Sequence, residues 1–377
     1  MYIKYVFGEK WPSQSAGISF TTFANYGIAQ ANPQNDIELI VTGQRQQDEV
    51  LNNYFGLKPL NNFNIKYIKD KSILSKTTKF YWNTYNYLKN KAKNKELDVI
   101  ITRKIGFFPF LLMLKKKYDI KIFYEAHNFY LDLSLKEEKH YKKKLYQKLF
   151  LPYFNGIICH HETLKDLYNN YLPNQKYIIA RTGIKNIYNY KKTNYNLAYI
   201  GALGDRKNLK DMFKALSKIK NQKSKLIIIG GTNKEKIKKC KKIAENYNVE
   251  DRIEITGWIN RKEIDDVLRN VMIGLVPLED IFFNRYLTSP MKIFNYFSHG
   301  IPVIGTNIPT VKEILNNKYG LLYRPNDYID LADKIDILME DNKLYNNISK
   351  KIINDYSSMK WKDRGEKILN SIEIIGE

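Results

Sequence analysis

The chain has 377 residues, which is long enough for two hydrophobic cores, and 44% of them are hydrophobic, which excludes an intrinsically disordered chain. Its only two cysteines, Cys159 and Cys240, exclude a disulfide scaffold and are typical of a reducing compartment. The formal net charge of +23 leaves three interpretations open: a Lys-rich composition without functional meaning, an anionic membrane surface as partner, or nucleic acid.

Short β-rich runs alternate with longer amphipathic stretches along the whole chain. In the first half we predict strands at Tyr2–Phe7, Ile37–Thr42, Ile65–Ile68, Val99–Thr102, Lys121–Glu125, Gly156–Cys159 and Tyr177–Ala180. In the second half we predict strands at Leu197–Ile200, Lys225–Gly230, Ile253–Thr256, Met272–Val276, Val303–Gly305 and Leu321–Tyr323. Strands that alternate with helices indicate parallel sheets built from βαβ units, and the nearly continuous apolar runs favour sheets covered on both faces.

A polar stretch without clear periodicity, residues 186–194, separates the two series and is interpreted as a linker. We therefore predict one Rossmann-like domain over residues 1–186, a second over residues 195–358, and a C-terminal helix over residues 359–377. In open parallel sheets ligands bind outside the carboxyl ends of the strands. The loops that follow the strands are therefore where a site is expected.

No apolar run is long enough to span a membrane, because the longest candidate, Phe107–Leu114, is broken by Pro109. The run Met1–Val6 is too short for the apolar core of a signal peptide. We therefore expect a cytoplasmic protein. Two Lys-rich and aromatic stretches, residues 76–95 and 107–121, have two interpretations: docking on the inner face of a membrane, or solvated helices with buried aromatic faces.

A helix that begins after a buried strand is the strongest candidate for a site. Ser289 is a predicted N-cap, Pro290 suits the first helical position, and the helix is expected to run from Met291 to His299 before Gly300. Free backbone N–H groups at such a start favour a diphosphate, and Lys292 would add a positive charge. The alternative is an ordinary capped helix without a ligand.

The run Asn284–Tyr296, followed by Gly300–Val303, resembles the donor-site signature of retaining glycosyltransferases of the family-4 type, the glycosyl transferases group 1. These enzymes have the GT-B fold, in which two Rossmann-like domains face each other across a cleft. The resemblance implies a UDP- or GDP-linked sugar donor and a glycan or lipid-linked acceptor, in cell-surface polysaccharide assembly. It also implies that the last helix crosses back to the first, acceptor-binding domain. The implied donor-site residues are Thr288, Ser289, Pro290, Met291, Lys292 and Asn295.

Other segments match the family in the same order. Lys207 matches the basic residue that holds the donor diphosphate, and Arg206 lies beside it in the sequence. Gly257, Trp258 and Ile259 match the loop along the nucleobase, His127 matches a histidine near the donor sugar, and Gly17 matches a small-residue loop after the first strand.

The chain departs from the family pattern at three positions. Ala202 stands where the family often has arginine, and Leu287 and Asn295 stand where it has a pair of glutamates. Asn295 can still hydrogen-bond a ribose hydroxyl, but it brings no charge. Residues 279, 280 and 284, which are Glu, Asp and Asn, are candidates for the missing sugar contact.

The remaining alternatives concern metals and function. Adjacent side chains on a strand point to opposite faces, so His160 and His161 are interpreted as structural rather than as metal ligands. The resemblance implies transfer without metal or cofactor, in which Lys207, Arg206 and Lys292 stabilise the leaving diphosphate. A nucleotide-sugar epimerase of the same fold is the alternative enzyme. Nucleic acid is not expected as a partner, because no binding motif accompanies the charge.

Overall fold

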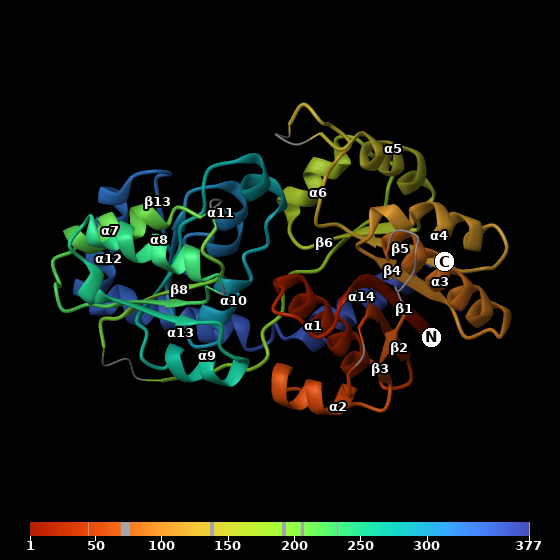
Figure 1. The fold of residues 1–377 in the computed structure, drawn as a ribbon, viewed down its shortest axis with the longest axis horizontal. Coiled ribbons are helices and arrows are strands. Elements are labelled where there is room, and N and C mark those ends of the chain that lie inside the picture. Colours follow the sequence, from red (N-terminus) through yellow and green to blue (C-terminus); the bar gives the residue numbers. More distant parts are fainter. Residues whose placement is uncertain are drawn as a thin grey trace. The chain divides into compact units, whose positions relative to one another are not determined.

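In a computed structural model the chain forms two compact units, one of Met1–Gly183 with Trp361–Glu377 and one of Ile184–Lys360 (Figure 1). The structure describes residues 1–43, 45–68, 76–135, 139–190, 194–204, 207–231 and 233–376. The stretch predicted as a linker follows the boundary at residue 184 and belongs to the second unit, apart from residues 191–193, which lie outside the described ranges.

The first unit contains a seven-stranded sheet in the order β3-β2-β1-β4-β5-β6-β7, in which all pairs are parallel. Its strands are β1 (Tyr2–Lys10), β2 (Asp36–Thr42), β3 (Phe63–Tyr67), β4 (Val99–Thr102), β5 (Lys121–Glu125), β6 (Gly156–Cys159) and β7 (Tyr177–Ile179). Its helices are α1 (Ala16–Ala31), α2 (Gln47–Val50), α3 (Lys76–Lys93), α4 (Phe108–Lys115), α5 (Tyr141–Phe150), α6 (Glu162–Asn169) and α14 (Trp361–Gly376).

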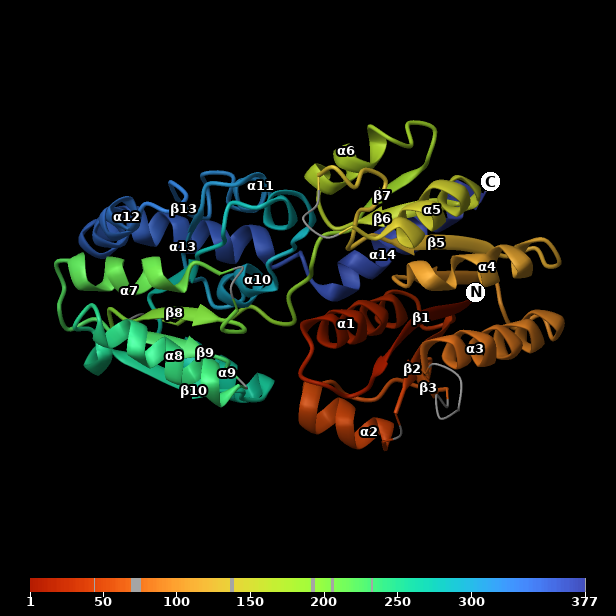
Figure 2. The ribbon, with the colours of Figure 1, turned by 45° about the horizontal axis from the view of Figure 1, so that its top comes forward.

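The last helix, α14, packs along α1 and completes the first unit. The two helix backbones approach closely because glycines face each other: a Cβ on Gly365 would lie 2.4 Å from the carbonyl oxygen of Gly27. Any larger residue at either position would push the helices apart. Elsewhere in the same unit, α4 packs against both α3 and α5, and the three helices lie side by side in Figure 2.

The second unit contains a six-stranded sheet in the order β10-β9-β8-β11-β12-β13, again with every pair parallel. Its strands are β8 (Leu197–Ile200), β9 (Leu226–Ile229), β10 (Ile253–Gly257), β11 (Ile273–Val276), β12 (Val303–Thr306) and β13 (Gly320–Tyr323). Its helices are α7 (Leu209–Lys218), α8 (Lys234–Glu245), α9 (Arg261–Leu268), α10 (Met291–Phe297), α11 (Pro309–Leu315), α12 (Tyr328–Glu340) and α13 (Asn342–Tyr356).

Both sheets are buried by apolar side chains on their faces, and each of the thirteen predicted strands is present. The ends agree within two residues, except that β1 continues three residues beyond its predicted end at Phe7. Strands β4, β6, β9, β11 and β12 are buried at every position, as expected for central strands covered on both faces. The prediction of two parallel-sheet Rossmann-like domains is confirmed.

Candidate functional site

In the second unit, three neighbouring strands are followed or ended by glycines in the left-handed region of backbone space. These are Gly201 after β8 (φ +140°), Gly230 and Gly231 after β9 (φ +134° and +93°), and Gly257 at the end of β10 (φ +71°). We call these four residues the glycine edge. A Cβ on Gly230 would lie 2.4 Å from the carbonyl oxygen of Gly201, so the two loops touch backbone to backbone. The edge therefore presents main chain, without side chains, at the carboxyl ends of the strands.

The side chain of Lys292 reaches this edge from α10 and is only 9% exposed. Its Nζ has no hydrogen-bond partner among the described residues. It lies 3.7 Å from the ring centroid of Tyr199 and 3.3 Å from the position that a Cβ on Gly201 would take. Burial, and secondly the charge of Lys207, hold the pKa of Lys292 well below its usual value of 10.5. A buried amine in this state gains most from an anion placed beside it.

Lys207 lies at the same edge because two loops are joined there. It forms an isolated β-bridge with Leu278, which follows β11, and the N–H of Asn208 donates to the carbonyl of Pro277 over 2.9 Å. Asn208 then caps α7, where its side-chain oxygen accepts from the N–H of Asp211 over 3.3 Å. Arg206, predicted beside Lys207, lies outside the described residues.

The start of α10 differs from the sequence prediction. Pro290 occupies the N-cap position and brings no side-chain hydrogen bond, so the prediction that Ser289 caps the helix is wrong. The helix also ends at Phe297 rather than at His299, although Gly300 has the left-handed backbone (φ +60°) expected after a helix. The seven-residue helix brings Lys292 to the edge through its first turn.

The residues before this helix are largely withdrawn from solvent. Thr288 is 9% exposed, and its N–H donates to the carbonyl of Phe283 over 3.0 Å at the end of a π-helical turn (Phe283–Leu287). Leu287, which replaces a glutamate of the family pattern, is buried in this turn. Met291 is half-buried in the first turn of α10. Of the acidic or amide substitutes considered for Leu287, Asn284 is buried and its amide donates to the carbonyl of Glu279 over 2.8 Å.

Asn295 lies in a polar cluster that joins α9 to α10. Its side-chain oxygen accepts a hydrogen bond from Arg261, whose guanidinium also lies 3.3 Å from Asp265. Asp265 lies in turn 3.6 Å from Nε2 of His299, and burial raises the pKa of this aspartate. The sequence analysis did not identify Arg261. The i, i+4 spacing of Arg261 and Asp265 was a signal for the pair, but nothing in the sequence linked it to Asn295.

The loop after β10 carries the remaining predicted residues of this unit. Gly257 belongs to the glycine edge and forms an isolated bridge with Gly230. Trp258 is 39% exposed, and Ile259 is half-buried against the core of the unit. The structure thus brings Lys207, Lys292 and Gly257 to one edge of one sheet, with Trp258 and Ile259 directly after it.

In the first sheet, the carboxyl ends of β4 and β5 are followed by polar side chains. Arg103, which follows β4, donates from Nη1 to the hydroxyl of Thr21 (3.2 Å) and the carbonyl of Gly17 (3.4 Å) on α1. Ser15 caps α1 by accepting from the N–H of Gly17 over 3.2 Å. Gly17 is tightly placed, because a Cβ there would lie 3.1 Å from the ring of Phe7.

His127 follows β5 at this edge and stacks on His160, with ring centroids 4.8 Å apart. Its Nε2 lies 4.0 Å from a carboxylate oxygen of Glu125 and has no hydrogen-bond partner among the described residues. Burial, followed by the charge of Arg103, holds the pKa of His127 well below its usual value of 6.5. The ring is therefore a neutral imidazole at physiological pH.

Glu125 is the centre of the cluster around His127, and the sequence analysis missed it. The carboxylate is buried and accepts from the hydroxyl of Tyr5 on β1 and from the guanidinium of Arg364 on α14. The position of Glu125 at a strand end was a usable signal. No sequence signal links Arg364 to this site, because only the packing of α14 on α1 brings it to the sheet.

The neighbouring histidines have structural roles. Nδ1 of His161 accepts from the N–H of Leu164 over 2.9 Å and caps α6, while His160 is buried between His127 and His161. Across the described ranges, no group of three or more His, Cys, Asp or Glu residues could hold a metal ion. Within the same ranges, no helix is long and apolar enough to cross a membrane.

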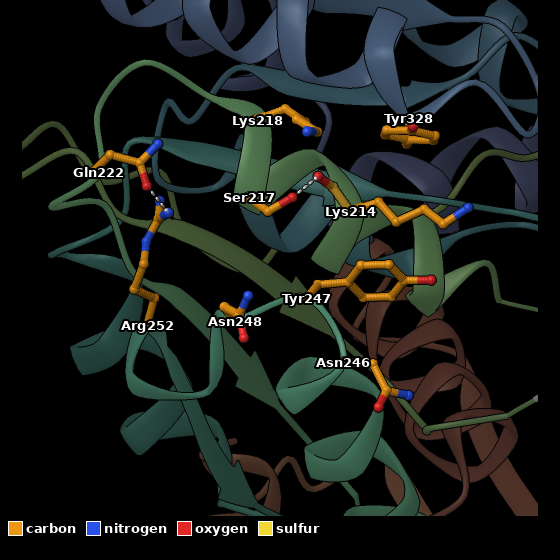
Figure 3. Close-up of a pocket in the computed structure, with 9 residues that line it drawn as sticks. All are labelled: Lys214, Ser217, Lys218, Gln222, Asn246, Tyr247, Asn248, Arg252 and Tyr328. Carbon is orange, nitrogen blue, oxygen red and sulfur yellow. Dashed lines mark hydrogen bonds between the residues drawn. The ribbon is translucent and has the colours of Figure 1, made fainter.

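A cavity of about 530 Å³ lies elsewhere in the second unit, between α7, the loop after α8 and the start of α12 (Figure 3). Lys214 points between two aromatic side chains there, with its Nζ 4.7 Å from the ring centroid of Tyr328 and 5.9 Å from that of Tyr247. The guanidinium of Arg252 donates hydrogen bonds to the carbonyl of Leu216 (2.8 Å) and to the side-chain oxygen of Gln222 (2.7 Å). The cavity shares no lining residue with the glycine edge.

The unit that carries the glycine edge is similar to a known protein family. Residues 181–355 match the family model of the glycosyl transferases group 1, and this range covers nearly all of the second unit. The second unit is therefore similar to the glycosyl transferases group 1 over almost its whole length. A search for related curated proteins found no match to the sequence.

Solved structures extend the likeness to the whole chain. The structure is similar to sucrose-phosphate synthase from Thermosynechococcus elongatus, with a TM-score of 0.78 and 12% identity, covering 100% of this chain and 99% of that chain. It is similar to HepE of Anabaena in complex with UDP and glucose, with a TM-score of 0.75 and 12% identity over 99% of both chains. A glycosyltransferase from Rickettsia africae gives a TM-score of 0.74 at 16% identity, over 99% of this chain and 98% of that chain. The chain thus has the GT-B fold.

Proposed function

We propose that the protein is a retaining glycosyltransferase that moves a sugar from a nucleotide-sugar donor to a glycan or lipid-linked acceptor, in the assembly of cell-surface polysaccharide. The observation that carries this proposal is the buried amine of Lys292 beside Gly201, which has no hydrogen-bond partner among the described residues, with Lys207 at the same edge. The group 1 family match of this unit supports a nucleotide-sugar donor, and the similar HepE structure, which holds UDP and glucose, favours UDP over GDP.

The glycine edge and the two lysines suit a diphosphate leaving group. As the glycosidic bond breaks, negative charge collects on the diphosphate, and positive groups fixed nearby stabilise it. Bare glycine backbone lets phosphate oxygens approach the main chain. Burial lowers the pKa of Lys292 and so disfavours its charged form, and an arriving phosphate favours the protonated form. Because Lys292 and Lys207 supply the charge, we propose that the transfer needs no metal ion.

The nucleoside is assigned to the loop after β10. We propose that the base lies along Gly257, Trp258 and Ile259, where main-chain groups meet its edge. Asn295 and Arg261, joined by their hydrogen bond, take the place of the family's glutamate at the ribose hydroxyls. An amide with a guanidinium offers donors and an acceptor to the ribose without a net negative charge.

We assign the acceptor to the first unit. There the neutral imidazole of His127 offers a hydrogen-bonding nitrogen, Nε2, that has no partner among the described residues. A neutral imidazole can accept or donate a hydrogen bond to a sugar hydroxyl, and it does so without adding charge beside the reacting carbon. His127 is therefore proposed to contact sugar rather than phosphate.

Thermal stability with UDP, GDP, ADP and CMP tests the donor site. A nucleotide that binds only the folded state raises the melting temperature, and we expect UDP or GDP to do so. Lys292→Met should abolish the shift. Lys214→Met, in the separate cavity of the same unit, should retain it. If none of the four nucleotides stabilises the wild type, the proposal is wrong.

Incubation with the matching nucleotide-sugar then identifies the reaction. A transferase releases nucleoside diphosphate faster when acceptor is added, and the anomeric configuration of the product, read by NMR, reports retention. Conversion of the donor to a stereoisomeric nucleotide-sugar without an acceptor would instead identify an epimerase.

A further inference from the structure

Helix α5 in the first unit exposes a continuous apolar stripe. Tyr141, Leu145, Leu149 and Tyr153 are 72%, 51%, 49% and 65% exposed, and they follow one another at intervals of four residues. Residues four apart in an α-helix are offset by only about 40°, so Tyr141, Leu145 and Leu149 lie on one side of α5, and Tyr153 follows in the 3₁₀ turn after its end. We call these four residues the α5 stripe.

The only fully buried residue of α5 is polar, whereas its two leucines are exposed. Gln147 is fully buried, where its side-chain oxygen accepts from the N–H of Tyr130 (2.7 Å) and its amide donates to the hydroxyl of Tyr168 (2.7 Å). A surface helix normally turns its leucines inward and its amides outward. Here the hydrogen bonds of Gln147 hold the helix in the opposite orientation.

The end of the stripe is fixed as well. The 3₁₀ turn Leu151–Tyr153 follows α5, and the ammonium group of Lys115 on α4 donates to the carbonyl of Tyr153 over 2.9 Å. Phe154 packs against Phe108 of α4, with ring centroids 4.7 Å apart. The helix therefore cannot roll to bury Leu145 and Leu149 without losing these contacts.

The surroundings of the stripe are basic. At about 100° per residue, Lys142 and Lys148 project about 60° to either side of Leu145. The neighbouring helices α3, α4 and α5 carry ten lysines and no Asp or Glu. Two more exposed apolar side chains, Trp82 of α3 and Met113 of α4, belong to the same layer of helices.

We propose that the α5 stripe docks on a lipid bilayer with anionic headgroups, with the leucines entering the acyl boundary and the lysines contacting the headgroups. Tyrosines at both ends of an apolar stripe suit the headgroup level, where an aromatic ring is partly dry and its hydroxyl is wet. Flanking lysines with no acidic neighbour on the helix complement anionic lipid. The α5 stripe itself lies outside the two stretches singled out in the sequence, residues 76–95 and 107–121, although helices from both stretches are its neighbours. It does not depend on the donor site.

Vesicle flotation of the full chain tests the proposal. Vesicles that contain phosphatidylglycerol should bind the wild type, and vesicles of phosphatidylcholine alone should bind it at least tenfold more weakly. The variant Leu145→Ser/Leu149→Ser should lose about tenfold or more in affinity, because two apolar side chains no longer enter the bilayer. The matched control is Ile329→Ser/Ile337→Ser on α12, whose side chains are 46% and 41% exposed; it should bind as the wild type does.

Two further measurements separate lipid from other partners. Bromine-labelled lipid should quench the fluorescence of Leu149→Trp more strongly than that of Ile337→Trp. The pair Lys142→Gln/Lys148→Gln should weaken binding and flatten its dependence on salt. Unchanged vesicle binding by the double serine variant overturns the proposal. So does light scattering that shows a wild-type dimer which this variant converts to monomer. The nucleotide-induced thermal shift should persist in every one of these variants, so failure here is distinguishable from failure of the donor site.

Discussion

At the carboxyl ends of β4 and β5, the first sheet carries polar side chains that bind one another, whereas the second sheet carries the glycine edge and the buried amine of Lys292. In the first unit the carboxylate of Glu125 is paired with Arg364 and Tyr5, both buried. In the second unit Lys292 is buried almost as deeply, and its Nζ has no hydrogen-bond partner within the described ranges. Both edges thus contain a buried ionisable side chain, but only Glu125 has a buried counter-charge within hydrogen-bonding distance.

The difference separates stability from binding. A buried charge that is paired within the protein holds the fold together, and removing its partner leaves an uncompensated charge. A buried amine without a partner destabilises the fold until a ligand supplies the missing charge. The carboxylate of Glu125 is therefore paired within the protein, whereas we propose that Lys292 is paired by a bound anion. The predictions below remove one group at a time from each edge.

The largest effect is expected at Glu125. Glu125→Gln leaves Arg364 buried without its counter-charge and should lower the free energy of unfolding by about 3–5 kcal/mol. Urea denaturation measures the change. The control is Glu9→Gln, whose partner is Lys104 and whose side chain is 46% exposed; it should cost less than about 1 kcal/mol. Equal effects for the two variants would show that burial of the Glu125 pair is energetically unimportant.

Gly230→Ala is expected to have the next largest effect, because it places a Cβ 2.4 Å from the carbonyl of Gly201 at a φ of +134°. We expect a loss of about 1–3 kcal/mol in the free energy of unfolding and a weaker response to nucleotide, since the glycine edge must open. In the control, Gly204→Ala, the new Cβ meets no described atom within 4 Å, and stability should change by less than about 0.5 kcal/mol. Full nucleotide response in Gly230→Ala would exclude this edge from the donor site.

The strands of both sheets could be predicted from the sequence because each is a short, nearly continuous apolar run between helical stretches. Lys207, Lys292 and Gly257 could be placed at one edge because parallel strands bring their carboxyl ends together. The cap of α10 could not be predicted. Ser289 and Pro290 are both acceptable before a helix, and only the backbone shows that Pro290 takes the N-cap position.

Contacts between distant segments were beyond the sequence. Arg364 reaches Glu125 only because glycines let α14 pack on α1, and neither residue type indicates the other. The α5 stripe was hidden for a different reason. Leucines spaced four apart normally predict a buried face, and here the hydrogen bonds of Gln147 turn them to solvent.

Lys292→Met should stabilise the protein in the absence of nucleotide, in contrast to Glu125→Gln. Because the pKa of Lys292 lies well below 10.5 in the folded state, the unfolded chain binds one more proton between the two pKa values. Wild-type stability at this site therefore rises as the pH rises toward 10.5. The advantage of Lys292→Met should shrink between pH 7 and pH 9, by at most about 1.4 kcal/mol per pH unit.

Urea denaturation at the two pH values measures this difference. Lys214→Met is the matched control, and its difference from the wild type should not change with pH in the same way. A destabilised Lys292→Met protein at pH 7 would mean that the amine has a partner in the folded state, and the second edge would then resemble the first.

The smallest effect is expected at His127, the ionisable group of the first edge that resembles Lys292 in having its pKa lowered by burial. The folded pKa lies well below 6.5, so below that pH the unfolded chain binds a proton that the folded protein does not. Stability therefore falls as the pH drops from 6.5 toward the folded pKa, by at most about 1.4 kcal/mol per pH unit. His127→Asn should reduce the dependence of the unfolding free energy on pH, because the unfolded variant no longer binds this proton. The charged and titratable groups around the ring are Arg103, Glu125, His160, His161 and Arg364.

Because these neighbours remain in the variant, the difference between wild type and His127→Asn isolates the one imidazole. The pH-dependent part of this difference in unfolding free energy should grow as the pH falls from 7 toward 5, and it should be absent above pH 7. His140→Asn, outside this cluster at the start of α5, should retain the wild-type slope. If His127→Asn also retains it, the ring is protonated in the folded protein and Glu125 acts as its counter-ion. His127 would then bring a positive charge, rather than a neutral nitrogen, to the sugar that it is proposed to contact.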